Sequence, residues 1–187
     1  MPKDIMGSIH FPKPVLLLLA VFSADSSAFD WARKRAETQW GTLVLESETF
    51  PFETFTDYYA QTMGETLPKR LWAFENLISP DLLPKIKYLT NDWEAEFKAF
   101  TDYSVERPLN IDPGYIDLGK LILASTKDHA HRIYLSEGIF AETTLMYTQK
   151  QWKPLPWTYP DYQSTGYQKF LTRCREYLKS KRQPRRS

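Results

Sequence analysis

The stretch "PVLLLLAVFSADSSA", Pro14–Ala28, decides the fold. Its apolar run Val15–Phe22 is compatible with the core of a signal peptide, with Lys3 and Lys13 as a basic flank and Ala24 as the small residue at a cleavage site. It is also compatible with a buried strand that runs into a helix. Cleavage near Ala24 would separate that strand from the helix packed beside it. We favour the strand, because the run has the length of a strand, and it is too short to span a bilayer.

The residues that follow the run predict an amphipathic helix. Asp25, Ser26 or Ser27 is a suitable N-cap, because its side-chain oxygen can accept a hydrogen bond from a backbone N–H of the first turn. Gly41 marks the end. The apolar residues between these points recur at helical spacing and would form one stripe: Phe29, Ala32, Ala36 and Trp40.

Two strands and an irregular segment are predicted next. "TLVLESETF", Thr42–Phe50, predicts a strand, and "RLWAFENL", Arg70–Leu77, predicts another because its side chains alternate between two faces. The aromatic segment Pro51–Gly64 between them is irregular, with a short helix at Asp57–Met63.

The second half of the chain predicts a long helix, a meander of strands and a closing helix. Ser79 and Pro80 begin the long helix, whose apolar face continues to Phe100. "LILAST", "HRIYL" and "IFAETTLMY" predict antiparallel strands. "PLPWTYPDY" is irregular, because its prolines prevent both helix continuation and central-strand pairing. The last helix begins near Ser164.

This order of elements predicts one α+β domain over residues 14–180. A strand, a helix, two strands, a helix and a further strand make a split βαβ, or ferredoxin-like, start. Additional antiparallel strands extend it, and a C-terminal helix closes it. Residues 1–13 and 181–187 are predicted to be flexible tails, and the second tail is basic.

Composition places few limits on function. The chain of 187 residues has a formal net charge of +1, and its 15% of aromatic residues is typical of a folded protein with a real core. Cys174 is the only cysteine, so no intramolecular disulfide can form and no oxidising compartment is required. We therefore expect a cytoplasmic protein that does not enter a membrane.

The stretch "DPGYIDLGKL", Asp112–Leu121, has the glycine and lysine spacing of a phosphate-binding P-loop. However, Leu121 stands where such a loop has the Ser or Thr that binds magnesium. Asp117 places a negative charge where phosphate would approach, and the preceding "RPLNIDP" is not an apolar strand. We therefore predict a turn at Pro113–Gly114 that leads into a strand, and no binding of GTP or ATP through Gly114–Lys120.

Several stretches resemble an uncharacterised prokaryotic family, the domain of unknown function 4416. They are "FENLISPDLLPKIKYLTNDWE", "NIDPGYIDLGKLILASTKDHAHRIYL", "GIFAETTL" and "PWTYPDY". The similarity extends roughly from Pro14 to Tyr162. It implies an intracellular protein without a secretion signal, which supports the strand at Val15–Phe22. Members are often named GTP-binding proteins automatically, and the resemblance implies no particular activity or catalytic residue.

His129 and His131 alternate as in a strand, so both rings could share one face. With Asp128 nearby, and with Asp112 or Glu142 added, they could bind a metal ion. Two histidines without a fixed third ligand are weak grounds for a metal site. We favour a turn histidine and a hydrogen-bonded sheet histidine, and the sequence identifies no cofactor.

Arg132 and Glu142 are predicted to face each other across two strands. A three-residue hairpin loop at Ser136–Gly138, with Gly138 in the left-handed conformation, places them directly opposite. The simpler interpretation, which we favour, is a cross-strand ion pair that contributes a fraction of a kcal/mol. In the functional alternative, the guanidinium is oriented by the carboxylate to hold a phosphate or carboxylate ligand.

The proline-stiffened loop "PWTYPDY" carries two candidate ring residues, Trp157 and Tyr159. If they are exposed, they could stack against a base or cover a cleft. If they are buried, which we favour, they fasten the loop to the sheet.

The leading functional hypothesis is a binding domain for an anionic small molecule, a nucleotide-like ligand or RNA. The site would lie on the later strands. Its candidate ligand-binding residues are Lys120, Lys127, Arg132, Trp157 and Tyr159.

Two alternatives use the same region. An enzyme acting on a phosphorylated or carboxylated substrate would use His131 as general acid or base, with Asp112 or Glu142 as its partner. A protein-docking scaffold would instead present an apolar aromatic surface.

Overall fold

The apolar run that opens the sequence forms the central strand β1, Leu16–Phe22, of the computed structural model. It lies between β4 (Pro68–Phe74) and β5 (Asn110–Asp117) and pairs antiparallel with both. All of its residues are buried, as expected for a strand that is covered on both faces. The strand predicted at Val15–Phe22 is therefore confirmed, and Val15 itself forms a bridge with Ile78.

The structure describes residues 8–52, 60–63 and 67–183. Besides β1, β4 and β5, the strands and helices in chain order are α1 (Ser26–Trp40), β2 (Leu43–Glu46), β3 (Phe50–Pro51), α2 (Ala60–Met63), η2 (Pro80–Leu82), α3 (Leu83–Phe100), β6 (Lys120–Ser125), β7 (Ile133–Ser136), β8 (Ile139–Thr148), β9 (Gln151–Pro154), η3 (Pro160–Gln163) and α4 (Thr165–Arg182), where η denotes a short 3-10 helix.

The strands form one nine-stranded antiparallel sheet in the order β2-β4-β1-β5-β6-β8-β7, with β3 beside β4 and β9 beside β8. β1 and β2 run parallel to each other on either side of β4, and β4 and β5 do so on either side of β1. This is the predicted split βαβ start. The predicted α+β class, the extension by antiparallel strands and the closing C-terminal helix are all confirmed.

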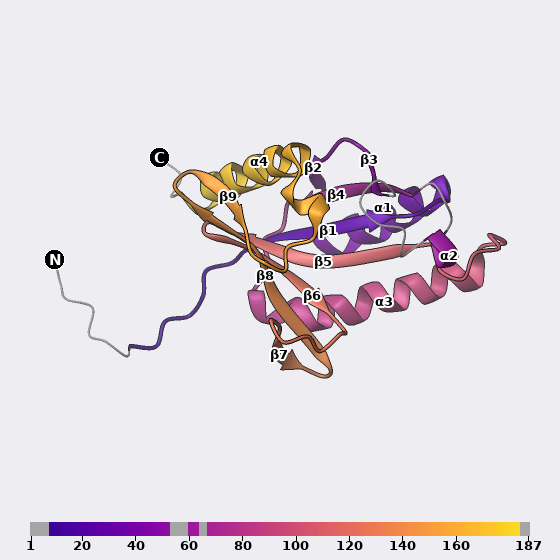
Figure 1. Ribbon diagram of the computed structural model, residues 1–187, viewed down its shortest axis with the longest axis horizontal. Coiled ribbons are helices and arrows are strands. Elements are labelled where there is room, and N and C mark those ends of the chain that lie inside the picture. Colours follow the sequence, from indigo (N-terminus) through magenta and orange to yellow (C-terminus); the bar gives the residue numbers. More distant parts are fainter. Residues whose placement is uncertain (1–7, 53–59, 64–66, 184–187) are drawn as a thin grey trace.

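Helices cover both faces of the central strands. In Figure 1, α4 lies above the sheet, and α3 lies below it. The alternation of β1 sends Leu17, Leu19 and Val21 towards α1 and α3, whereas Leu16 and Leu18 face α4. The domain therefore has two apolar cores, one on each face.

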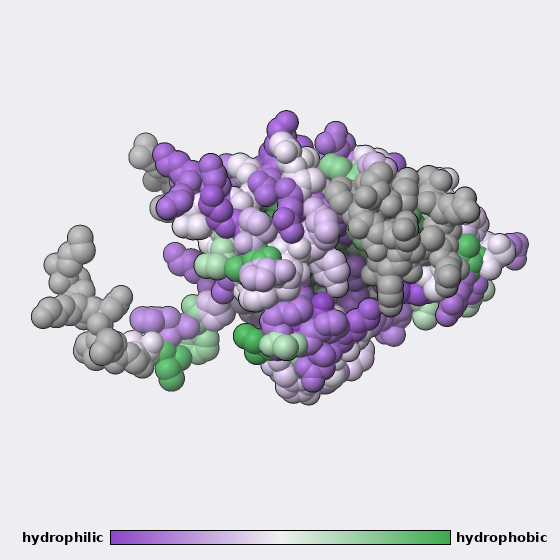
Figure 2. All heavy atoms as spheres, in the orientation of Figure 1, coloured by the Kyte–Doolittle hydropathy of each residue, from purple (hydrophilic) through white to green (hydrophobic). Residues whose placement is uncertain are grey.

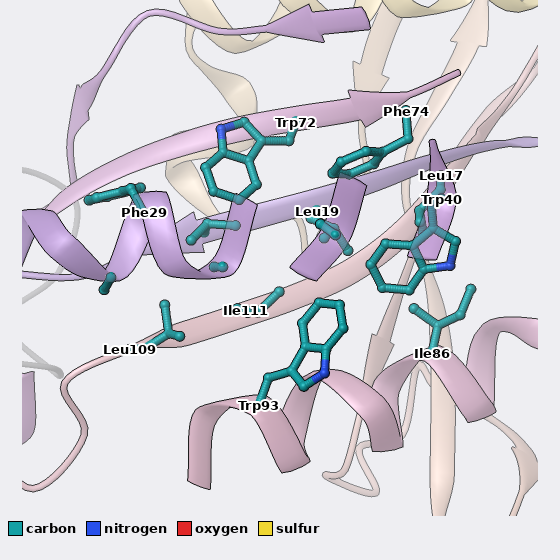
Figure 3. Close-up of a cluster of buried hydrophobic side chains, with 14 of the residues drawn as sticks. Leu17, Leu19, Phe29, Trp40, Trp72, Phe74, Ile86, Trp93, Leu109 and Ile111 are labelled. Atoms are coloured by element: carbon teal, nitrogen blue, oxygen red, sulfur yellow. The ribbon is translucent and has the colours of Figure 1, made fainter. Parts of the chain in front are cut away.

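Aromatic rings fill much of the core under α1 and α3. Figure 3 shows Trp40 from α1 close to Trp93 from α3, with Trp72 and Phe74 contributed by β4. The Trp40 and Trp93 ring centroids are 5.3 Å apart. Such large rings bury much apolar area and so hold both helices against the sheet.

Two of the three predicted helix starts are capped as expected, but Ser79 makes no cap hydrogen bond, and the long helix α3 begins at Leu83, after the 3-10 turn η2. The Asp25 side chain accepts a hydrogen bond from Ser27 N at the start of α1, and Gly41 ends that helix with a φ of 79°. The Ser164 side chain accepts from Tyr167 N at the start of α4. Because capping depends on neighbouring residues, local sequence is sufficient to predict these two caps.

Several boundaries differ from the prediction. The strand expected at Thr42–Phe50 is divided into β2 and β3, because Ser47 leaves the ladder and its side-chain oxygen accepts from Leu71 N at 2.9 Å. The short strand β9 was not predicted. Its hairpin turn uses Gln149 and Lys150 with φ of 51° and 60°, although such turns usually carry Asn, Asp or Gly.

The closing helix continues to Arg182, two residues beyond the predicted end of the domain. The Arg182 guanidinium lies 2.7 Å from Asp117 Oδ1 and donates to Pro14 O at 2.9 Å. Of the short helix expected at Asp57–Met63, α2 accounts for the last four residues, and 57–59 lie outside the described residues. Within the described parts of the chain, no helix has the length and apolar character needed to cross a bilayer.

β5 and β6 form a fork. They are paired from the hairpin turn as far as Gly114 and Leu123, and this pairing does not extend towards Asn110. Beyond the fork, α3 satisfies the backbone of β5. Glu94 Oε1 accepts from Ile111 N at 2.8 Å, and Lys87 Nζ donates to Ile111 O at 3.2 Å. Buried backbone groups need such partners when a ladder ends.

The P-loop-like stretch is the hairpin that closes this fork. Gly114 lies inside β5, Leu118 and Gly119 form the turn, and β6 begins at Lys120. A strand follows where a P-loop would require the N-terminus of a helix. The stretch is a turn followed by a strand, but the turn was predicted at Pro113–Gly114, which lies inside β5, and it is found further along the chain, at Leu118–Gly119.

Gly114 is expected to be required for this hairpin. A Cβ atom at Gly114 would lie 2.2 Å from the backbone oxygen of Ile122, so Gly114→Ala should lower the free energy of unfolding by about 1–3 kcal/mol. Gly119→Ala is the matched control, since the position that its Cβ would take has no neighbouring atom within 4 Å. Urea denaturation of both variants measures the difference, and equal stability would contradict this account.

Nucleotides are not expected to bind through the hairpin. Lys120 is exposed on a strand and does not follow a loop that leads into a helix N-terminus. We expect Lys120→Ala to leave the affinity for GTP and ATP unchanged in isothermal titration with magnesium. Micromolar GTP binding that this variant abolishes would contradict the prediction.

Candidate functional site

A cleft of about 640 Å³ opens where β5 and β6 separate. Its walls come from the ends of β1 and β6, the starts of β4 and β5, β8, α3 and the residues around η3. Figure 2 shows hydrophilic residues over the region of β6, β7 and β8 in the lower part of the view. The charged residues that line the cleft are Lys69, Lys87, Glu94, Arg107, Asp112, Lys127, Arg132, Glu142 and Asp161.

The cleft continues the sheet face that α4 covers. Leu16, Leu18 and Ala20 of β1 face α4 in the apolar core, and two residues further on the same face reaches Phe22 in the cleft. The antiparallel register places Lys69 and Asn110 on either side of Phe22. The face therefore changes from apolar to polar beyond the N-terminus of α4.

Arg132 and Glu142 form a buried ion pair in this cleft. Arg132 Nε lies 2.8 Å from Glu142 Oε2, and the two side chains are 5% and 2% exposed. Arg132 Nη1 also donates to Ser125 Oγ at 2.7 Å and to Lys127 O at 3.1 Å. The pair was predicted, but its interpretation as a weak surface contact is wrong, because both groups are removed from water.

The hairpin that sets this pair differs from the predicted one. The turn has two residues, Glu137 and Gly138, with φ of 52° and 77°, and Ser136 pairs directly with Ile139. A register shift between Tyr134 and Ser136 then restores the pairing expected for a three-residue loop. The bulge thus compensates for the shorter turn, and Arg132 reaches Glu142 from just before β7.

His131 binds the same carboxylate from outside the cleft. Its Nε2 lies 3.0 Å from Glu142 Oε2, and its ring is stacked on Trp157 with the centroids 5.1 Å apart. Trp157 Nε1 donates to Thr143 O at 2.9 Å. Trp157 therefore fastens the loop to β8, as favoured, and holds His131 in place, whereas Tyr159 is exposed and the favoured burial was wrong for that ring.

The structure does not support a metal site at the histidines. His129 and His131 lie on the turn before β7 and do not alternate along a strand. Their ring centroids are 5.8 Å apart. Among the described residues, no cluster of three or more His, Cys, Asp or Glu side chains is placed to hold a metal ion.

Lys87 of α3 and Asp112 of β5 form a second ion pair, on the opposite wall. Lys87 Nζ lies 3.1 Å from Asp112 Oδ1, and Asn110 Nδ2 donates to Asp112 Oδ2 at 3.0 Å. Burial alone would raise the pKa of Asp112, but the ammonium groups of Lys87 and Lys69 and the two hydrogen bonds outweigh it and lower that pKa. Asp112 is therefore ionised at neutral pH.

The pKa of Glu94 is shifted in the opposite direction to that of Asp112. Its carboxylate bonds Ile111 N and lies 3.3 Å from Arg107 Nη2. Burial nevertheless raises the pKa of Glu94 above its ordinary value, despite the opposing effect of Lys87. Two carboxyls on one wall thus have environments that move their pKa values apart.

A fourth ion pair closes the cleft at η3. Lys69 Nζ lies 2.8 Å from Asp161 Oδ2, and both side chains are almost fully buried. The rings of Phe22, Phe52 and Tyr162 lie within about 5 Å of the same ammonium group, so cation–π contacts contribute to holding it.

Five of the candidate residues line the cleft and four do not. Lys127, Arg132, Tyr159, Asp112 and Glu142 line it. Lys120 lies at the hairpin end of β6, away from the fork, so it cannot join Arg132 in one patch. Trp157, His129 and His131 are also outside the wall, although His131 and Trp157 support Glu142 from behind.

Sequence reasoning missed the α3 residues and Lys69. Lys87 and Glu94 are seven positions apart, so they lie on one helix face two turns apart. Lys87 lies next to the apolar stripe and is itself buried. A lysine at such a position is the one signal that could have identified this wall. Lys69 lies near the start of β4 and is buried.

Comparison with known proteins identifies a family but no relative of known activity. No curated protein and no solved structure gave a significant match. A family model described as Domain of unknown function (DUF4416) matches residues 13–177, which include every residue of the cleft. The chain therefore belongs to the DUF4416 family.

Proposed function

We propose that the cleft binds a small anionic molecule and that Arg132 is its principal contact. The observation that supports this most directly is the fixed guanidinium. Glu142, Ser125 and the Lys127 carbonyl hold Nε and Nη1, while Nη2 has no hydrogen-bond partner among the described residues. A planar guanidinium fixed in this way is well suited to a phosphate or carboxylate.

The balance of charge in the cleft supports an anion. Five cationic side chains and four carboxylates line it. Each of these carboxylates lies within 3.3 Å of a basic nitrogen, so the carboxylates among the described residues are compensated and do not exclude an anion. The volume of about 640 Å³ is typical of a site for a small molecule.

The same balance favours a small molecule over RNA. A nucleic-acid groove needs a large excess of Lys and Arg to neutralise successive phosphates, whereas this cleft has nearly equal numbers of acids and bases. A charged cleft also differs from the flat apolar patch expected of a docking scaffold.

We expect anions to stabilise the protein through Lys127 and Arg132. Inorganic phosphate and phosphorylated metabolites should raise the melting temperature of the full chain, since ligand at a hundred times its Kd adds about 2.7 kcal/mol. Lys127→Ala should reduce this shift. Arg132→Lys keeps the charge but loses the planar fork, and should weaken binding by about tenfold or more.

Lys120→Ala is the matched control, because it removes an exposed lysine at the other end of β6. This variant should keep the full rise in melting temperature caused by anions. Added sodium chloride at equal ionic strength should not reproduce that rise. Arg132→Ala is less informative, since removing the guanidinium partner of the buried Glu142 costs about 3–5 kcal/mol. Equal loss in the Lys127 and Lys120 variants would contradict the proposed site.

A second candidate, an acid–base enzyme, is favoured by the hydrogen bond between His131 and Glu142. Glu142 faces the cleft, and His131 contacts its Oε2 at 3.0 Å from behind. Glu142 would then exchange a proton with the substrate, and Asp112 on the facing wall would be the second ionised group. His131 would position Glu142 without touching the substrate.

In the enzyme case, Glu142→Gln should lower turnover of a phosphorylated or carboxylated substrate by about a hundredfold or more. His131→Asn should shift the pH profile of kcat, because it removes the partner that orients the carboxylate. His129→Asn, which alters the neighbouring exposed ring, is the control and should leave the profile unchanged. If Glu142→Gln turns over as fast as the native protein, the enzyme hypothesis is wrong.

We further propose a cytoplasmic location and a ferredoxin-like arrangement for the β1–β5 unit. The single buried cysteine, which makes no disulfide necessary, supports the first. The strand order β2-β4-β1-β5 supports the second. Cell fractionation tests the location.

A further inference from the structure

Tyr162 carries a buried hydroxyl that the protein itself does not satisfy. It lies in η3, is 2% exposed and lines the cleft. Its hydroxyl oxygen has no hydrogen-bond partner among the described residues. An unsatisfied buried polar group costs about 1–3 kcal/mol, and most such groups in folded proteins have a partner. Because Tyr162 lines the cleft, a bound molecule that packs against this side chain is the partner considered for the hydroxyl.

The surroundings of Tyr162 define what that partner is. Burial raises the pKa of Tyr162 well above its ordinary value, and the carboxylates of Asp161, Asp112 and Glu142 raise it further. The hydroxyl therefore stays protonated and remains a donor. Three carboxylates nearby disfavour a second anion at this point, so the group it meets is a neutral oxygen, such as a hydroxyl or a carbonyl.

Other residues that line the cleft are also uncharged. Asn91 and Thr126 add neutral polar side chains, and Tyr159 and Phe22 add rings. Neutral donors and acceptors match the hydroxyl groups of a sugar, while aromatic rings match its apolar faces. Arg132 and Lys127 then provide the place for its charge.

We propose that the ligand of this cleft is a polyhydroxylated anion, a phosphorylated or carboxylated sugar, and that the Tyr162 hydroxyl donates a hydrogen bond to one of its neutral oxygens. This rests on the proposed binding of an anion. The acidic group lies at Arg132, and the neutral oxygen lies at the η3 wall.

The chain offers a matched control in Tyr167. Its hydroxyl is also buried without a hydrogen bond of normal geometry among the described residues, although the Asp161 carboxylate is close enough to raise the pKa of Tyr167. Its ring packs on that of Tyr162 in the same core, but Tyr167 does not line the cleft. Tyr162→Phe and Tyr167→Phe therefore remove the same atom from neighbouring buried positions, of which only the first lines the cleft.

The test measures binding of four probes to the full chain by titration calorimetry and thermal shift. The probes are inorganic phosphate, a pentose phosphate, a hexose phosphate and a uronic acid. At least one sugar anion should bind the native protein more tightly than phosphate does. Tyr162→Phe should weaken the binding of that sugar anion about tenfold, as expected for loss of a hydrogen bond at a desolvated site. The affinity for inorganic phosphate should change little. Tyr167→Phe should change neither.

The unliganded Tyr162→Phe variant should melt at the native temperature or slightly above it, because the lost hydroxyl bonds nothing in the protein. A clear fall in its melting temperature would show that the hydroxyl is satisfied internally and would overturn the inference. So would unchanged affinity of this variant for the sugar anions. If phosphate binds through Arg132 and Lys127 but no sugar anion binds more tightly, the ligand class is wrong and anion binding stands. If no anion binds at all, both proposals fail.

Discussion

The contact between Gly114 and Ile122 is the constraint on which the site depends. The backbones of β5 and β6 approach so closely there that a Cβ on residue 114 would lie 2.2 Å from the Ile122 oxygen. On one side of this contact the two strands form an ordinary hairpin, and on the other their pairing ends and a cleft opens. Glycine is required for the close approach and not for an unusual φ, since its φ is not positive.

A fork inside a sheet exposes backbone groups that would otherwise be paired, and α3 compensates for this. Glu94 and Lys87 bond the N–H and C=O of Ile111, while the apolar face of the same helix packs against the central strands through Trp93 and Phe97. One helix thus stabilises the core and brings charge to the cleft. Charges brought into a partly dry site need partners, which explains why each carboxylate there lies beside a base.

Local patterns predicted the elements well where neighbours along the chain determine the structure. β1, α1, the caps Asp25 and Ser164 and the closing helix followed from hydrophobic spacing and capping residues. The pairing of Arg132 with Glu142 was also predicted, but through a hairpin loop of the wrong length. A register shift beside Leu135 restored the alignment, and bulges of this kind leave little trace in the sequence. Asp112 and Glu142 were placed among the candidates, whereas Lys69, Lys87 and Glu94 were not, because each acts across a long separation in the chain.

The sequence alone determined that this chain forms an α+β domain with a buried first strand, and that Gly114–Lys120 lacks the residues of a P-loop. Both conclusions rest on short-range properties: apolar periodicity, capping, and the chemistry required at each position of a motif. Only the tertiary structure decided where a ligand could lie. The cleft joins β1, β4, β5, β6, β8, α3 and η3, and its polarity depends on which charges face each other after the sheet has forked. Such pairings depend on distances between residues far apart in the chain, and the order of residues does not encode those distances locally.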